Sequence, residues 1–173
     1  GHFRIRREGS RVVLETILET ILDTSGLDTI VIPEGVTDME IDALRGAYFK
    51  TLRIPASLTG DLQFGENDGH NVIWEVAEGN PRYSAADGIL IDEEKHMVVS
   101  GWREAEKVVI PEGVEIIGDH AFYSCNLTEI TLPSTLREIQ AFAFADTNKL
   151  TAVSFPESLE KLHASAFIYS GFQ

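Results

Sequence analysis

Two stretches of the chain are near copies of each other, and the interval between them constrains the fold more than any other feature. Residues 108–122 align with residues 130–144, so that Pro111 and Pro133 lie 22 residues apart, and Pro156 follows after a further 23 residues. A fixed period of this length is typical of a stacked repeat, in which each repeat buries its apolar side chains against its neighbours. Such a chain is built as an extended surface, so we expect a functional site on a face.

Apolar residues recur at fixed offsets from each proline. The pair at −3 and −1 alternates, which predicts a short strand that has one buried face and ends at the proline. These pairs are Ile30 and Ile32, Leu52 and Ile54, Val108 and Ile110, Ile130 and Leu132, and Val153 and Phe155. An alanine at +10 is followed at +11 by a large apolar residue, which we expect to fill the interior between repeats. These pairs are Ala43 and Leu44, Ala121 and Phe122, Ala143 and Phe144, and Ala166 and Phe167.

Stacking these repeats gives each buried side chain a neighbour above and below. We therefore predict an α/β repeat solenoid over residues 27–173, in which the strands of successive repeats form one parallel sheet. The returning segments would form the opposite wall as loops with short helical turns. A length of 173 residues fits one elongated domain.

The spacing fails between Pro55 and Pro111, which are 56 residues apart. Trp74 and Val76 match the missing −3 and −1 pair, and Trp74 is predicted to be part of the core. The region from about 78 to 104 is an insertion: two apolar runs, 89–91 and 96–99, flank a polar turn and predict a β-hairpin. Because the repeats resume in register afterwards, the hairpin is expected to be an addition whose turn at 92–95 is dispensable.

Residues 1–26 do not follow the repeat and predict a separate N-terminal cap. Apolar residues between Ser10 and Ser25 are spaced by three and four, which favours an amphipathic helix with Ser10 as its N-cap. The β-branched residues in this segment leave a strand as the alternative. Either element would cover the apolar cross-section of the first repeat. A helix that binds a partner is the rival interpretation.

The repeat resembles the BspA-type leucine-rich repeat proteins. In that family an apolar strand and a proline are followed by an Ile-Gly pair and an Ala-Phe pair, often with a cysteine; Gly118, Ala121, Phe122 and Cys125 match this pattern, and residues 80–90 resemble a hairpin module that interrupts repeats in the same family. The resemblance covers residues 27–173. It implies a right-handed leucine-rich-repeat solenoid. It also implies an exported or surface-exposed protein of host-associated bacteria, with adhesion as the usual proposed role.

The sequence carries departures from that pattern in its N-terminal half. Leu44 stands where the family has phenylalanine, and the repeat after Pro55 lacks the Ala-Phe pair. These departures affect the regularity of the first repeats and leave the predicted fold unchanged.

Composition narrows the classes of partner. The chain has 14 Lys and Arg against 28 Asp and Glu, a net charge of −14, which opposes binding to nucleic acid because that requires a basic footprint. No apolar run approaches the ~18 residues that a membrane-spanning helix requires. The preferred interpretation of this net negative charge is that it keeps the protein soluble. An acidic face that recruits a basic partner is the alternative.

Motifs that carry chemistry are missing from the sequence. It contains no Gly-x-Ser-x-Gly, His-Glu-x-x-His or Cys-x-x-Cys motif and no phosphate-binding glycine loop. The single cysteine, Cys125, excludes an internal disulfide and is expected to be a small buried residue. We therefore expect no enzymatic activity, no cofactor and no metal site.

The outward-facing side chains of the predicted sheet are the candidate binding surface, called the outer strip below. Positions −4 and −2 point away from the core, opposite to −3 and −1. The strip comprises Thr29, Val31, Thr51, Arg53, Ile73, Glu75, Lys107, Val109, Glu129, Thr131 and Ser154. Six strands at ~4.8 Å spacing would make it roughly 24 Å long, enough to hold a peptide or part of a protein. A solvated face without a ligand is the alternative.

We conclude from the sequence that the chain is a non-enzymatic cell-surface or secreted repeat protein that presents a face to a protein or host ligand, in the manner of an adhesin. A structural spacer without a ligand is one alternative, and a carbohydrate-binding module or an enzyme without a recognisable motif is another. Weak self-association is a further expectation, because the last predicted strand, 153–155, would expose an unpaired edge unless Phe172 and the tail fold over it.

Overall fold

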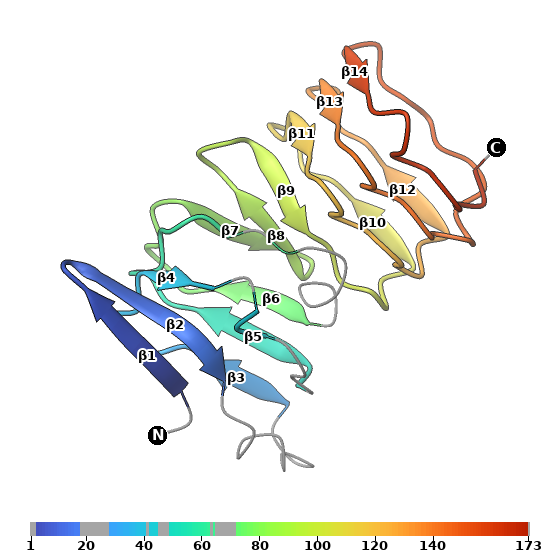
Figure 1. Cartoon of the computed structure of the whole chain (residues 1–173). Coiled ribbons are helices and arrows are strands. Elements are labelled where there is room, and N and C mark those ends of the chain that lie inside the picture. Colours follow the sequence, from blue (N-terminus) through green and yellow to red (C-terminus); the bar gives the residue numbers. More distant parts are fainter. Residues whose placement is uncertain are drawn as a thin grey trace.

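The strands predicted beside the prolines form the first of two walls. The computed structural model describes residues 3–17, 28–40, 42–44, 49–62, 64 and 72–172. β3 (Thr29–Val31), β5 (Thr51–Ile54) and β6 (Ile73–Val76) form one parallel sheet, and β10 (Lys107–Val109) and β12 (Glu129–Thr131) form another (Figure 1). Residues one repeat apart are partners in both sheets, as Ile30 is with Leu52. The predicted repeat period and the strand around Trp74 are thereby confirmed.

The opposite wall is built from strands as well. Its strands occupy positions +5 and +6 after Pro33, Pro111, Pro133 and Pro156. They are β4 (Asp38–Met39), β11 (Ile116–Ile117), β13 (Glu138–Ile139) and β14 (Lys161–Leu162). β11, β13 and β14 pair in parallel, so each turn satisfies its backbone groups with the next one. Over the described residues the chain has no helix, and the predicted helical turns and the α/β class are therefore wrong. The fold is a solenoid of β-strands and turns.

The Ala-Phe pairs line one corner of the solenoid, as predicted. Ala121, Ala143 and Ala166 are fully buried, and their small side chains let successive turns approach to hydrogen-bond distance. The amide N–H of Phe122 donates to the carbonyl oxygen of Ala143 at 2.8 Å, and the N–H of Phe144 repeats this contact one turn later. The phenylalanine rings then fill the space between the two walls.

A β-meander divides the stack between β6 and β10. β7 (Tyr83–Ala86), β8 (Ile89–Asp92) and β9 (Met97–Ser100) are antiparallel neighbours, which confirms the predicted hairpin as β8 and β9 and adds a third strand. β9 pairs in parallel with β11 and so takes the place of a second-wall strand. Figure 1 shows β9 lying between the first repeats and the last ones.

β8 lies between two hydrophobic cores. Leu90 packs into the core formed by the N-terminal repeats, whereas Ile89 and Ile91 pack into the core formed by the C-terminal repeats. The alternation of a strand places these side chains on opposite faces, and both faces are buried. The meander is thus a partition between the two cores. The expectation that it is an addition to the stack is wrong, because it supplies core residues and a wall strand.

Arg82 anchors this partition to an earlier turn. Its guanidinium donates to Asp92 at 2.8 Å and to the carbonyl oxygen of Thr59 at 2.9 Å, and it also pairs with Asp61. Asp92 is 1% exposed and accepts the backbone N–H groups of the turn that follows it. A buried carboxylate is stable here because a cation and backbone donors surround it. The turn predicted to be dispensable therefore begins at a buried, fully bonded residue.

The N-terminal segment is a β-hairpin. β1 (Phe3–Glu8) and β2 (Arg11–Ile17) are antiparallel, and Gly9 has the positive φ of 60° that the tight turn between them requires. The helix favoured from Ser10 is therefore wrong over residues 10–17, and the strand alternative is confirmed there; residues 18–25 of that prediction lie outside the described residues. β2 pairs in parallel with β4 and buries Leu14 in the N-terminal core. Capping of the first repeat remains a prediction for this segment.

The last repeat departs from the predicted pattern. Residues 151–156 form no strand, and Phe155 is 37% exposed, so the predicted strand at 153–155 is wrong. The Phe172 ring packs edge-on against Phe155 and contacts Phe167 at 5.1 Å between centroids. The tail thus folds back over this end, which was the stated alternative to an open edge. The predicted self-association at this end assumed an unpaired strand at 153–155, and the structure has no strand there.

Candidate binding face

The N-terminal half of the outer strip is assembled as the sequence predicts. Pairing in the first-wall sheet places Thr29, Thr51 and Ile73 in one row across β3, β5 and β6. A second row contains Val31, Arg53 and Glu75. The second row is the more accessible one, because Thr51 is 8% exposed and Ile73 is half-buried in the first row.

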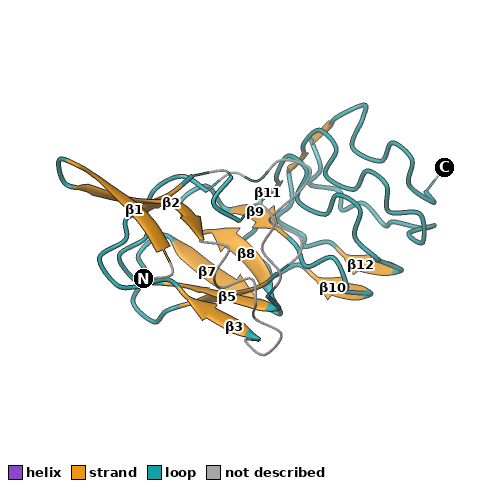
Figure 2. Cartoon of the chain, turned by 60° about the horizontal axis from the view of Figure 1, so that its bottom comes forward, coloured by secondary structure: helices purple, strands orange, loops and turns teal. Residues whose placement is uncertain are grey.

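The C-terminal half of the strip lies on β10 and β12. Lys107 is paired with Glu129, and Val109 with Thr131. Val109 is 62% exposed. Among the described residues, no other large aliphatic side chain is as exposed. Figure 2, which brings the underside forward, shows β3 and β5 apart from β10 and β12.

The strip is therefore two patches and not one continuous surface. β6 has no strand-to-strand pairing with β10, and the amide N–H of Trp74 instead donates to the carbonyl oxygen of Gly88 in the meander. Ser154, the last predicted member, is exposed on a segment without a strand. The predicted six-strand strip is wrong in its continuity, because the meander occupies the interval between the two sheets.

Charges on the strip compensate each other. Arg53 forms an ion pair with Glu75 at 3.3 Å, and Lys107 forms one with Glu129 at 3.0 Å. Both pairs run across neighbouring strands, where opposite charges stabilise a sheet modestly. With two cations and two anions the strip is neutral, in a chain whose net charge is −14.

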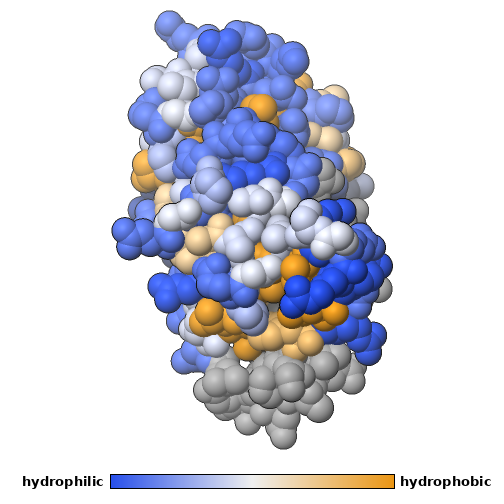
Figure 3. All heavy atoms as spheres, turned by 90° about the vertical axis from the view of Figure 1, so that its left-hand side faces the viewer, coloured by the Kyte–Doolittle hydropathy of each residue, from blue (hydrophilic) through white to orange (hydrophobic). Residues whose placement is uncertain are grey.

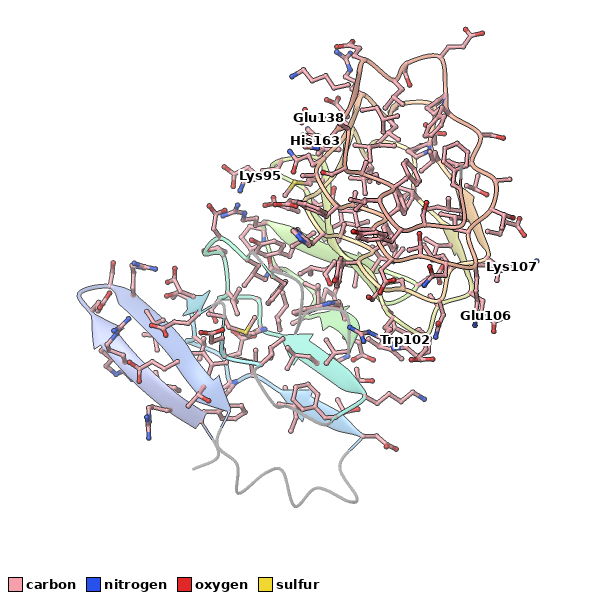
Figure 4. The ribbon with its side chains drawn as sticks, turned by 45° about the vertical axis from the view of Figure 1, so that its right-hand side comes forward. Lys95, Trp102, Glu106, Lys107, Glu138 and His163 are labelled. Atoms are coloured by element: carbon pink, nitrogen blue, oxygen red, sulfur yellow. The ribbon has the colours of Figure 1, made fainter. Side chains whose placement is uncertain are left out.

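A hollow on the opposite wall was not predicted. It has a volume of about 600 Å³ and is lined mainly by β13 and β14 and the residues after them, including Glu138, Lys161, Leu162 and His163. Figure 4 shows Glu138 and His163 on one side of the stack and Glu106 and Lys107 on the other. Polar residues recur at +5 and +7 after Pro133 and Pro156, and they could have indicated a polar surface here: Glu138, Gln140, Lys161 and His163. The second wall was, however, expected to be loop.

The hollow has little chemical reactivity. Lys161 lies 3.8 Å from Glu138 and Arg137 lies 3.6 Å from Glu160, so two of the three carboxylates that line the hollow are paired with cations, and the third, Asp119, lies 2.6 Å from His120 Nδ1. His163 Nδ1 lies 2.9 Å from the hydroxyl of Ser165. Within the part of the chain that the structure describes, no group of three or more His, Cys, Asp or Glu side chains could hold a metal ion.

Cys125 and Tyr83 are two buried groups whose acidity is altered by their surroundings. Burial raises the pKa of the Cys125 thiol to about 12 and that of the Tyr83 hydroxyl to about 12. The Cys125 side chain is therefore a protonated thiol at neutral pH, as expected for a small buried residue. Tyr83 accepts the N–H of Leu62 and donates to the carbonyl oxygen of Gly60, so it ties the meander to an earlier corner.

Over the described residues, no helix is long and apolar enough to cross a membrane.

Comparisons with known proteins point to one type of repeat. Residues 100–172 match the family model described as "BspA type Leucine rich repeat region (6 copies)". Among curated proteins, none matches this sequence. The crystal structure of the pneumococcal vaccine antigen PcpA superposes with a TM-score of 0.56 at 21% identity, over 77% of this chain and 40% of PcpA. At this identity the likeness shows a shared fold.

A second solved structure is similar over more of the chain but superposes less closely. It is a leucine-rich cell surface protein from Faecalibacterium prausnitzii, with a TM-score of 0.48 and 20% identity over 87% of this chain and 53% of that protein. The chain thus spans less than two thirds of the length of either structure.

Proposed function

We propose that the chain is a non-enzymatic, cell-surface or secreted bacterial repeat protein of the BspA-type leucine-rich repeat family, whose model matches residues 100–172. Its role is to present a binding face for a protein or another host ligand, as an adhesin does. The face is the outer strip on the first wall, and adhesion is the activity it serves.

The observation that carries the proposal is a pair of exposed valines in a neutral surface. Val31 is 55% exposed and Val109 is 62% exposed, one on each sheet of the first wall. Taking a fully exposed valine side chain to full burial contributes about 1.5–3 kcal/mol, and a partner that covers Val31 or Val109 would gain somewhat more than half of that amount. The neighbouring charges are already paired, so a partner that covers the strip leaves no unpaired charge behind. A neutral strip also avoids the repulsion that the rest of this acidic chain exerts on acidic ligands.

The test is binding of the purified chain to an array of host extracellular proteins and glycans. Val31→Asp and Val109→Asp place a carboxylate on each patch, and each is expected to weaken binding of any protein ligand by about tenfold or more. Leu162→Asp is the matched control, because Leu162 is a 48% exposed aliphatic residue on the opposite wall. Melting temperatures of all three variants should stay close to that of the unmodified chain.

Three outcomes would overturn the proposal. Equal binding by the Val31, Val109 and Leu162 variants would move the ligand site off the outer strip. Failure to bind any protein or glycan on the array would favour the structural spacer. A glycan ligand whose binding does not depend on the strip valines would favour a carbohydrate-binding module.

A further inference from the structure

We propose that β1, at the N-terminal end of the second wall, is a docking edge that takes up an extended acidic peptide segment as an added strand. This surface is separate from the outer strip. The sheet has the order β1-β2-β4, so one side of β1 pairs with β2 and no described strand pairs with the other. A strand paired on one side only presents outward-facing N–H and C=O groups along its free side, to which another strand can bond.

β1 is the longest free edge that the described strands offer. It has six residues, five of which are exposed. The other strands at the ends of sheets are shorter: β6 and β7 have four residues each, β3, β10 and β12 have three, and β4 and β14 have two. Six residues are long enough for a ladder of several hydrogen bonds, whereas a two-residue edge is too short to bind a peptide by its backbone.

The charge of β1 is opposite to that of the whole chain. Three of its six residues are arginines, and residues 3–17 together carry four arginines and two glutamates, a local excess of two positive charges in a chain of net charge −14. Arg6 is balanced by Glu8, Glu15 and Glu40. Arg4 and Arg7, in contrast, have no carboxylate partner among the residues that the structure describes. These two side chains are available to an acidic partner.

The alternation of β1 defines the pattern that the partner should carry. Arg6 contacts Glu15 and Glu40 and so occupies the outer face of the sheet. Ile5 and Arg7 occupy the other face, which they share with their cross-strand partners Leu14 and Val12. Ile5 is 40% exposed. A strand added beside β1 would therefore place an apolar residue next to Ile5 and, two residues away on the same face, an acidic residue next to Arg7.

Figure 3 faces the N-terminal end of the molecule, and in the lower half of the view, at the height of β1 in Figure 1, strongly hydrophilic and apolar atoms lie next to one another. A partner with both acidic and apolar residues matches a surface of this mixed kind.

A second copy of the chain is a poor occupant of the same edge. Antiparallel pairing of β1 with another β1 would bring six arginines into two adjacent strands, and like charges on facing positions destabilise a sheet. We therefore expect the segment that pairs with β1 to be an acidic peptide of another protein and not a second copy of this chain.

The test uses the full chain and a short synthetic peptide that repeats Val-Thr-Glu-Thr, so that a Val and a Glu lie two residues apart on the same face of the added strand. Its binding is measured by calorimetry at low salt and by hydrogen exchange of the β1 amides. We expect binding, slower exchange of β1 amides on adding the peptide, and weaker binding at high salt, because salt screens exposed ion pairs. A peptide with Lys in place of Glu should not bind.

Variants separate docking at β1 from general attraction between charges. Arg4→Glu with Arg7→Glu should lower the affinity on the order of tenfold or more. Lys149→Glu is the control, since it makes the same kind of charge reversal at an exposed site far along the chain. Val109→Asp should leave peptide binding unchanged, so a failure here is distinct from a failure of the proposed function. The proposal is overturned if the Glu peptide does not bind, if β1 exchange is unaffected, or if both charge-reversed variants bind alike.

Discussion

The rings of Phe122 and Phe144 lie one above the other, with centroids 5.3 Å apart and planes within 2° of parallel. Phe167 continues this stack at 5.0 Å from Phe144. A residue that recurs at one offset of each repeat thus forms a column through the C-terminal core. Phe144 is the member with an aromatic neighbour on both sides, and it is fully buried.

Replacing Phe144 by alanine should destabilise the fold by about 3–5 kcal/mol, because the change opens a cavity and removes two ring contacts. Urea unfolding measures the effect. Phe142→Ala is the matched control: Phe142 is 36% exposed and stacks only on His120 at the surface, so its loss should cost no more than about 1 kcal/mol. Equal effects of the two variants would contradict a structural role for the column.

Removing the carboxylate of Asp92 should weaken the partition. Asp92→Ala leaves the guanidinium of Arg82, whose side chain is 13% exposed, without its buried partner, and the expected cost is about 3–5 kcal/mol. Glu94→Ala serves as control, since Glu94 lies 3.6 Å from the same arginine but is 74% exposed, and its loss should cost less than about 0.5 kcal/mol. An unchanged melting temperature for Asp92→Ala would mean that the meander does not depend on this ion pair.

Gly118 is predicted to tolerate no side chain. A Cβ atom there would lie 2.6 Å from the carbonyl oxygen of Val98, the same oxygen that accepts the Gly118 N–H at 2.9 Å. Backbone cannot withdraw without weakening the pairing of β9 with the turn after β11, so Gly118→Ala should cost about 1–3 kcal/mol. Thermal unfolding measures this cost, and faster hydrogen exchange of the Gly118 amide should accompany it. Wild-type stability and exchange in this variant would show that the backbone accommodates a Cβ atom at Gly118 without weakening this hydrogen bond.

Stability should fall in acid partly through Asp38. The hydrogen bond from Arg11, at 2.7 Å, holds the pKa of the Asp38 carboxyl below its usual value, and Thr37 adds a second donor. A pKa that is lower in the folded chain than in the unfolded one means stabilisation at neutral pH that is lost as the pH falls below about 4. Asp38→Asn should thus be less stable than the unmodified chain at neutral pH, and the difference should shrink in acid.

Thermal unfolding of both proteins across this pH range checks the expectation. Glu78→Gln is a suitable control, because Glu78 is exposed and makes no ion pair with any described residue. A stability difference for Asp38→Asn that stays constant from neutral pH into acid would exclude the titration of Asp38 as its cause.

The sequence alone was enough to predict which side chains face the interior of the repeats. Trp74, Phe122 and Phe144 were each assigned to the core from their offset, and each is at most 1% exposed. The reason is physical: in a stack with a constant period, residues one repeat apart occupy equivalent places, so a column of apolar residues in the sequence is a column in space. For the same reason the outward-facing residues of each strand, such as Val31 and Val109, could be assigned to a surface.

The tertiary structure decided which segments pair with one another. Val13 and Leu14 have the spacing of a helix face with Ile17, yet both are buried in a strand. The reason is that β1 and β4 pair with β2 on its two sides, and this pairing outweighs local propensity. The short strands of the second wall are equally invisible in the sequence, since two residues carry no periodicity.

Continuity of the outer strip likewise depended on contacts between distant residues. The apolar run at 89–91 predicts a strand, but only the finished fold sets Leu90 in one core and Ile91 in the other. That position divides the first wall into two sheets and separates Glu75 from Lys107. Hydrogen bonds between segments far apart in the chain, such as that from Trp74 to Gly88, fix this arrangement, and a periodic pattern determines only which way each side chain faces.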